Sequence, residues 1–125
     1  VPVIEKSQYD AFFNTDLESR LRREKVEQLL IAGVTTHLCC ESTARSAFAR
    51  GFAVFVAIDG TATLNRELHF ASLRGMAHGF AIPRLAADLL ADAPAPVQRQ
   101  LMLLLCSHFV SSQVRGFHPC RISHY

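Results

Sequence analysis

Two apolar runs without polar alternation, at residues 29–34 and 52–58, constrain the fold of this chain more than any other feature. Strands that are apolar on both faces are typical of parallel sheets with helices packed on each side. A shorter run at residues 1–5 predicts a third strand of the same kind. The chain therefore needs helices between these runs to cover the sheet.

Helical patterns follow each run, at residues 16–24, 39–50, 65–80 and 84–92. Asp16 is a candidate N-cap and Gly51 a candidate C-cap, while residues 60–63 are expected to form a loop. The apolar side of the third helix is expected to carry Leu68, Ala71, Leu73 and Met76. This order predicts an α/β fold, with a three-layer, Rossmann-like parallel sheet flanked by helices.

The composition excludes several classes of function. With 13 basic and 11 acidic residues among 125, the formal net charge is +2, which gives no electrostatic case for nucleic acid or an anionic membrane. No apolar run is long enough to span a bilayer, and no signal peptide is recognisable. Four cysteines, two of them adjacent, indicate free thiols in a reducing cytoplasm rather than a disulfide framework.

Three ionisable side chains, Lys6, Cys39 and Asp59, follow or end the predicted strands. Right-handed crossovers place the carboxyl ends of the strands on one edge, where open sheets bind ligands, so these groups are expected to converge. In a first helical turn, unpaired N–H groups favour the Cys39 thiolate, and a nearby ammonium lowers its pKa further. Cys40 would instead pack against the sheet as an inert hydrophobe. An interpretation in which both cysteines only pack stays open.

A set of residues in this region forms a recognisable motif. It reads Gly-Val-x-Thr-x-x-Cys and continues into a helix with Thr-Ala-Arg-x-Ala, here Gly33, Val34, Thr36, Cys39, Thr43, Ala44, Arg45 and Ala47. Upstream, a lysine is followed by Phe and by Thr-Asp-Leu. Residues 1–92 in this way resemble the isochorismatase-like cysteine hydrolases, a superfamily that includes nicotinamidases, N-carbamoylsarcosine amidohydrolases, biuret hydrolases and ureidoacrylate amidohydrolases. We expect residues 1–93 to form the C-terminal part of such a domain, and residues 94–125 an extension outside it.

The resemblance implies a function and a set of site residues. Cys39 would attack the carbonyl of a small amide or ureido compound and form a thioester, without a cofactor, and Lys6 would polarise the site. The N–H groups of Thr35 and Cys39 would form the oxyanion hole, with a cis peptide bond between Val34 and Thr35. Asp59 would be structural and hold the loop after its strand.

Two further residues are candidates for the substrate pocket. His37 lies where many members of the superfamily have Asp or Asn. Glu41 would either contact the substrate or simply favour the N-terminus of its helix.

The superfamily's catalytic aspartate and its metal ligands lie in a first strand that this sequence does not contain. We therefore expect an N-terminally incomplete domain with no metal site and with little hydrolase activity of its own. The resemblance also implies a homo-oligomer, and a sheet without this strand would expose edges that pair with other chains. A non-catalytic binding or oligomerisation subunit with the same fold is the alternative.

The tail, residues 97–125, carries its own pattern. Residues 97–110 fit a buried helix or a strand, and residues 111–125 are expected to be irregular. Its potential metal ligands are Cys106, His108, His118, Cys120 and His124. Their spacings are unusual for structural zinc, and the alternative is a core Cys106 with solvated histidines.

Overall fold

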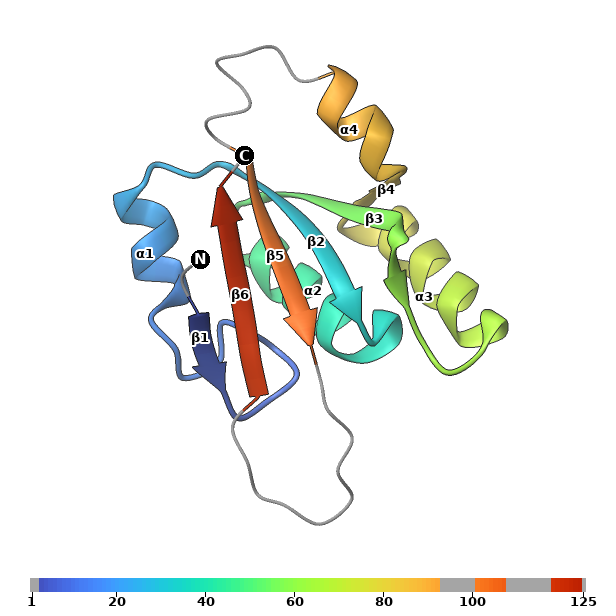
Figure 1. Cartoon of the computed structure of the whole chain (residues 1–125), viewed down its shortest axis with the longest axis horizontal. Coiled ribbons are helices and arrows are strands. Elements are labelled where there is room, and N and C mark those ends of the chain that lie inside the picture. Colours follow the sequence, from blue (N-terminus) through green and yellow to red (C-terminus); the bar gives the residue numbers. More distant parts are fainter. Residues whose placement is uncertain (1–2, 93–100, 108–117, 125) are drawn as a thin grey trace.

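The computed structural model of the chain describes residues 3–92, 101–107 and 118–124. Within them, six strands form one sheet in the order β1-β6-β5-β2-β3-β4 (Figure 1). The strands are β1 Val3–Lys6, β2 Gln28–Val34, β3 Ala53–Ala62, β4 Ile82–Arg84, β5 Leu101–Ser107 and β6 His118–His124. The helices are α1 Leu17–Arg23, the π-helical turn η1 Thr36–Cys40, α2 Glu41–Ala49, α3 Arg66–Gly79 and α4 Ala86–Asp92.

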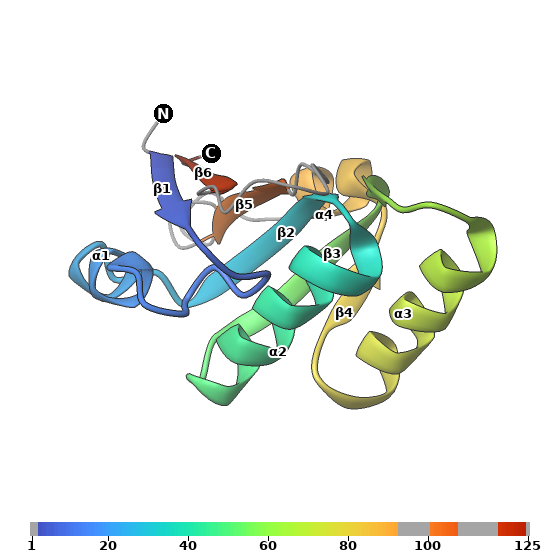
Figure 2. The ribbon, with the colours of Figure 1, turned by 90° about the horizontal axis from the view of Figure 1, so that it is seen from below.

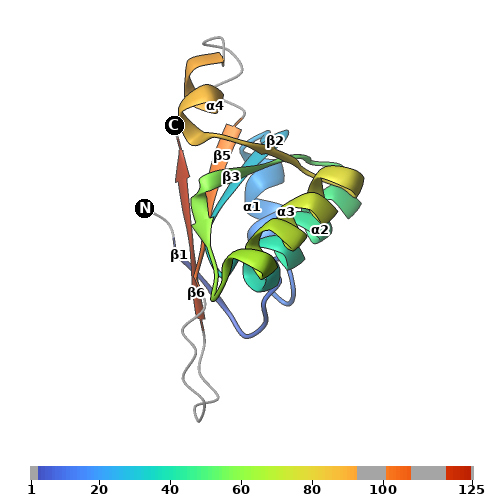
Figure 3. The same cartoon turned by 90° about the vertical axis from the view of Figure 1, so that its right-hand side faces the viewer.

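The predicted α/β architecture is confirmed, because helices cover both faces of a largely parallel sheet. In Figure 2 the helices α1, α2 and α3 lie on one face, and Figure 3 shows the same layer edge-on with α4 apart from it. The first core contains Leu29, Ile31, Val54 and Val56 of β2 and β3, and the second contains Leu30, Ala32, Ala57 and Leu89. Burial on both faces explains why the two apolar runs have no polar alternation.

Residues 118–124 form strand β6, so the expectation of irregular structure is wrong for this part of the tail. β6 pairs antiparallel with both β5 and β1, while β5 runs parallel to β2 from Gln28↔Leu101 to Val34↔Ser107. Residues 101–107 therefore take the strand alternative of the two that the sequence left open. The tail places two strands between β1 and β2, which periodicity could not reveal because pairing depends on tertiary contacts.

Two other boundaries differ from expectation. The predicted loop at residues 60–63 is largely strand, since β3 continues to Ala62 after a register shift between Ile31 and Gly33 of β2. The hydroxyl of Thr61 donates to the Ala57 carbonyl over 2.9 Å, a hydrogen bond that spans the irregular part of β3. A short strand, β4, precedes α4 and was not predicted because it has three residues with a central proline.

Only two of the four residues predicted to form the buried side of α3 are buried. Leu73 and Met76 are buried, but Leu68 and Ala71 are exposed, and Ser72 is 5% exposed in their place. A serine is tolerated there because its hydroxyl finds hydrogen-bond partners in neighbouring elements. Among the residues that the structure describes, no helix is long and apolar enough to cross a membrane.

Candidate active site

The carboxyl ends of five strands lie on one edge of the sheet. β2, β3, β4 and β5 are parallel, and β1 runs the same way because both β1 and β5 are antiparallel to β6. Lys6 at the end of β1 and the turn after Val34 are therefore brought to the same edge. Asp59 lies three residues before the end of β3 and is exposed.

The turn that carries Cys39 leaves β2 directly. The Val34–Thr35 peptide bond is cis, and the N–H groups of Leu38 and Cys40 both donate to the Thr35 carbonyl over 3.2 Å. Residues 36–40 are π-helical, so the expected first α-helical turn at Cys39 is instead a π turn, and α2 begins at Glu41. Cys39 therefore lies in a non-standard turn, a feature that is frequent at functional sites.

Burial does not separate the two cysteines. Cys40 is fully buried in the core with Ala44 and Ala47, as the sequence predicts, but Cys39 is also 0% exposed. Neither forms a disulfide. A difference in reactivity between them would therefore have to come from local electrostatics and not from exposure.

Lys6 is 1% exposed, which is rare for a lysine. Its Nζ donates to the carbonyl oxygens of Gln8 over 2.8 Å and Tyr9 over 3.2 Å. The Tyr9 carbonyl also accepts from the Thr43 hydroxyl over 3.3 Å, and the same hydroxyl accepts from the Ala11 N–H over 3.0 Å. The segment after β1 is in this way fastened to α2, one turn beyond Cys39.

His37 and Glu41, the two candidate pocket residues, line one groove of about 390 Å³. Other residues that line it are Asp10, Ser42, Arg45, Ser46, Ala49 and Arg50. His37 Nδ1 lies 2.8 Å from Thr63 Oγ1, and Glu41 forms an ion pair with Arg45 at 3.4 Å. The groove therefore offers charged groups of both signs next to the cysteine turn.

Thr35 and Asp59 have contrasting surroundings. The hydroxyl oxygen of Thr35 is buried and has no hydrogen-bond partner within the described part of the chain. Such an orphaned group is costly unless something else satisfies it. Asp59 Oδ1 accepts from the N–H of Ala86, the first residue of α4, over 2.9 Å. The hydrogen-bond partner of Asp59 is thus the start of α4, which follows β4, rather than the loop after its own strand.

Sequence reasoning missed two polar residues of α3 that contact the cysteine turn. His69 Nδ1 lies 2.9 Å from Thr36 Oγ1. The single hydroxyl hydrogen of Ser72 is shared between Glu41 Oε2 at 2.5 Å and, more weakly, the Thr36 carbonyl at 3.4 Å. The two residues are one helical turn apart, so they share a face. Their polar character on an otherwise buried side was the available signal.

The described residues hold no cluster of three or more potential metal ligands. In the tail, His108 lies outside the described residues. His118 and His124 begin and end the seven-residue strand β6, so they are about 20 Å apart and cannot share one ion. Cys106 and Cys120 are register partners across β5 and β6.

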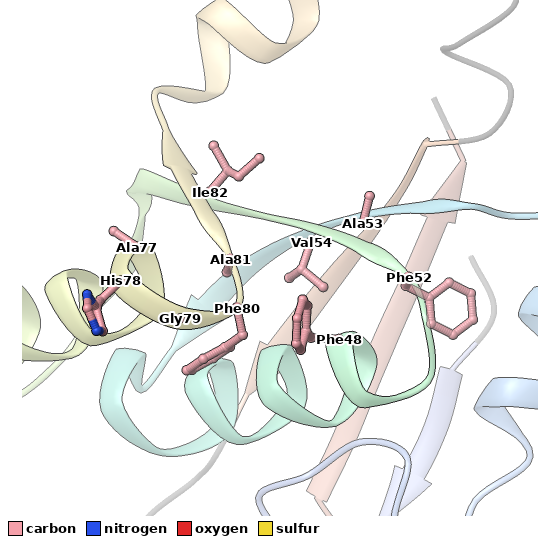
Figure 4. Close-up of a pocket in the computed structure, with 10 residues that line it drawn as sticks. All are labelled: Phe48, Phe52, Ala53, Val54, Ala77, His78, Gly79, Phe80, Ala81 and Ile82. Atoms are coloured by element: carbon pink, nitrogen blue, oxygen red, sulfur yellow. The ribbon is translucent and has the colours of Figure 1, made fainter.

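A second cavity lies away from the cysteine turn. It has a volume of about 320 Å³ and is lined mainly by apolar residues of α2, β3, the end of α3 and β4, among them Phe48, Phe80 and Ile82 (Figure 4). Among the described residues that line this cavity, His78 is the one with a titratable side chain. This composition is poorly suited to hydrolysis, which needs a nucleophile and a group that handles protons.

Comparison with known proteins agrees with this arrangement. A model of the isochorismatase domain matches residues 1–88. Nicotinamidase 3 of Arabidopsis thaliana is 49% identical over 79 residues, which cover 63% of this chain and 40% of that protein. Enterobactin synthase component B of Escherichia coli is 35% identical over 95 residues, 76% of this chain and 32% of that protein. The chain thus spans well under half the length of these curated relatives.

Solved structures show the same likeness. The nicotinamidase of Staphylococcus aureus superposes with a TM-score of 0.63 at 35% identity, over 65% of this chain and 53% of that one. An isochorismatase-like hydrolase from Alkaliphilus metalliredigens gives a TM-score of 0.68 at 28% identity, over 70% and 49%. Because the domain model covers residues 1–88 and the fold agrees, the chain belongs to the isochorismatase family.

Proposed function

We propose that this chain is the cysteine-bearing part of a hydrolase that cleaves the C–N bond of a small amide or ureido compound. The observation that carries the proposal is the placement of Cys39 in a π turn directly after Thr35, on the sheet edge that also holds the buried ammonium of Lys6. The family and its nicotinamidase members support the same chemistry.

In the proposed reaction, the Cys39 thiolate attacks the substrate carbonyl carbon and forms a C–S bond. The oxygen gains the electron pair, and the N–H groups of Thr35 and Cys39 stabilise the oxyanion. The C–N bond then breaks, and the leaving nitrogen takes up the proton that the thiol gave to a general base, the role that the family resemblance gives to an aspartate outside these residues. Water hydrolyses the resulting thioester to the acid and restores the thiol.

The remaining residues bind and orient. The ammonium of Lys6 favours the thiolate, because a nearby positive charge lowers a thiol's pKa. His37 and Glu41 would contact the polar end of the substrate from the groove that they share. The orphaned hydroxyl of Thr35 supports this proposal, since a bound amide would satisfy it.

We extend this proposal to the whole protein, since the chain spans about a third to two fifths of the curated relatives it matches. We expect little turnover from the purified chain, and we expect the active form to be a homo-oligomer in a reducing compartment, where thiols stay free. Substantial Cys39-dependent release of ammonia from nicotinamide by this chain alone would contradict the expectation of low turnover.

Alkylation with iodoacetamide tests the nucleophile without requiring turnover. Cys40 is the matched internal control, since the two adjacent thiols are equally buried. We expect Cys39 to react with a pH midpoint well below the ordinary thiol value of about 8.5, and Cys40 to react slowly throughout. Equal, ordinary midpoints for both, measured by peptide mass spectrometry, would favour a non-catalytic subunit in which the cysteines only pack.

A further inference from the structure

Helix α3 holds the first residue of the cysteine turn at two points. The side chain of His69 meets the hydroxyl of Thr36 at 2.9 Å, and the hydroxyl of Ser72 lies 3.4 Å from the carbonyl oxygen of the same threonine. One helix in this way contacts both the side chain and the backbone of Thr36. A residue held at both places has little freedom to change its orientation.

The shorter of these contacts, between His69 and the Thr36 hydroxyl, is costly to lose because Thr36 is 0% exposed. Water cannot replace a lost partner at a fully buried hydroxyl, so breaking the contact with His69 would leave the oxygen unsatisfied. His69 itself is only half-buried, and α3 is anchored in the core by Leu73 and Met76. The helix and the cysteine turn therefore share one core, and α3 can support the turn from its polar residues.

Helix α3 also contacts the residue that follows the cysteine turn. Ser72 is 2.5 Å from Glu41 Oε2, and Glu41 is the first residue of α2. Thr36 lies three residues before Cys39 and Glu41 two residues after it. The cysteine is thus bracketed by two anchor points that belong to a single face of α3.

We infer that His69 is a positioning residue for Cys39, acting through Thr36. By holding Thr36, it keeps the π turn in the shape that aligns backbone N–H groups with the sulfur and with the developing oxyanion. Ser72 supports the same turn through the backbone carbonyl of Thr36. The inference rests on the proposed function of Cys39, and it assigns α3 a role beyond packing.

The test compares the pH profile of Cys39 alkylation in wild-type protein with that of His69→Ala. The midpoint reports stabilisation of the thiolate, whereas the plateau rate reports access to the buried sulfur. We expect the midpoint of His69→Ala to rise by about one pH unit, which slows alkylation at pH 6.5 by about tenfold. His69→Asn, whose amide can bond the Thr36 hydroxyl, is expected to restore most of the shift.

Two further variants separate positioning from general loosening. Thr36→Val removes the same contact from its other partner, so it is expected to match His69→Ala, and the double variant should add no further shift. His78→Ala is the control, because His78 lies on the same helix but lines the apolar cavity near β4. It should leave the Cys39 midpoint unchanged.

The outcomes also distinguish this inference from the proposed function. An ordinary wild-type midpoint would count against Cys39 as the nucleophile. Identical midpoints and plateaus in wild type and His69→Ala would overturn the positioning role, whatever the wild-type value. A shift of equal size in His78→Ala would overturn it as well, because the effect would then come from α3 as a whole.

Discussion

Lys6 and Thr43 donate hydrogen bonds to the same carbonyl oxygen, that of Tyr9, over 3.2 and 3.3 Å. Lys6 ends an edge strand, whereas Thr43 lies in α2 beyond the cysteine turn. Because the two donors share one acceptor, the position of the buried ammonium is tied to the helix that continues from Cys39. This link connects two site elements that lie 37 residues apart.

The first prediction concerns this link. In Thr43→Val the Ala11 N–H loses its acceptor and the Tyr9 carbonyl loses one donor, while the side-chain volume stays similar. We expect the free energy of unfolding in urea to fall by about 1–3 kcal/mol, the cost of leaving buried polar groups unpaired. Thr43→Ser keeps the hydroxyl and is the control. Equal stability of the Val and Ser variants would show that the shared carbonyl contributes nothing.

Lys6→Met tests the ammonium itself. Methionine fills similar space without charge, so the midpoint of Cys39 alkylation should rise by about one pH unit if Lys6 supports the thiolate. Glu5→Met is the control, because Glu5 is the exposed neighbour on the other face of β1 and should leave the midpoint unchanged. An unchanged midpoint in Lys6→Met would restrict Lys6 to holding the carbonyls of Gln8 and Tyr9.

Asp59→Ala, which removes the acceptor of the Ala86 N–H, asks whether this aspartate takes part in the chemistry. The carboxylate accepts from the Ala86 N–H at the start of α4, so its loss should lower the free energy of unfolding by about 0.5–2 kcal/mol, as for other helix caps. The pH profile of Cys39 alkylation should not change. A clear shift of that profile would contradict the structural role and would add Asp59 to the site.

Two glycines provide opposite predictions. A Cβ at Gly60 would lie 2.8 Å from Ala57 Cβ and 3.3 Å from Ala32 Cβ, whereas a Cβ at Gly75 would meet nothing within 4 Å. Gly60→Ala should therefore destabilise the fold by about 1–3 kcal/mol through overpacking. Gly75→Ala, in the exposed interior of α3, should stabilise it by about 0.5–1 kcal/mol. Thermal unfolding of both variants checks the pair, and a stable Gly60→Ala protein would contradict the tight irregularity in β3.

Particular residues show what the sequence could predict. The runs that became β2 and β3 were recognisable because both of their faces are buried, and the strand-edge rule then assigned Lys6 and the turn with Cys39 to the same edge of the sheet. β6 and the contact between His69 and Thr36 could not be predicted, since each depends on where a distant segment packs. No local pattern in residues 118–124 specifies partners on two sides, and no spacing relates residue 69 to residue 36.

The last prediction tests the place of the tail in the sheet. β5 has strand partners on both sides, β2 and β6, so its backbone N–H groups should be protected from exchange with deuterium. We expect exchange at residues 101–107 to be at least about 100-fold slower than in an unstructured chain, as in central strands of stable sheets. The short edge strand β4 should exchange faster, because it pairs on one side only. Rapid exchange throughout residues 101–107, with slow exchange retained in residues 28–34, would show that the tail does not join the sheet in solution.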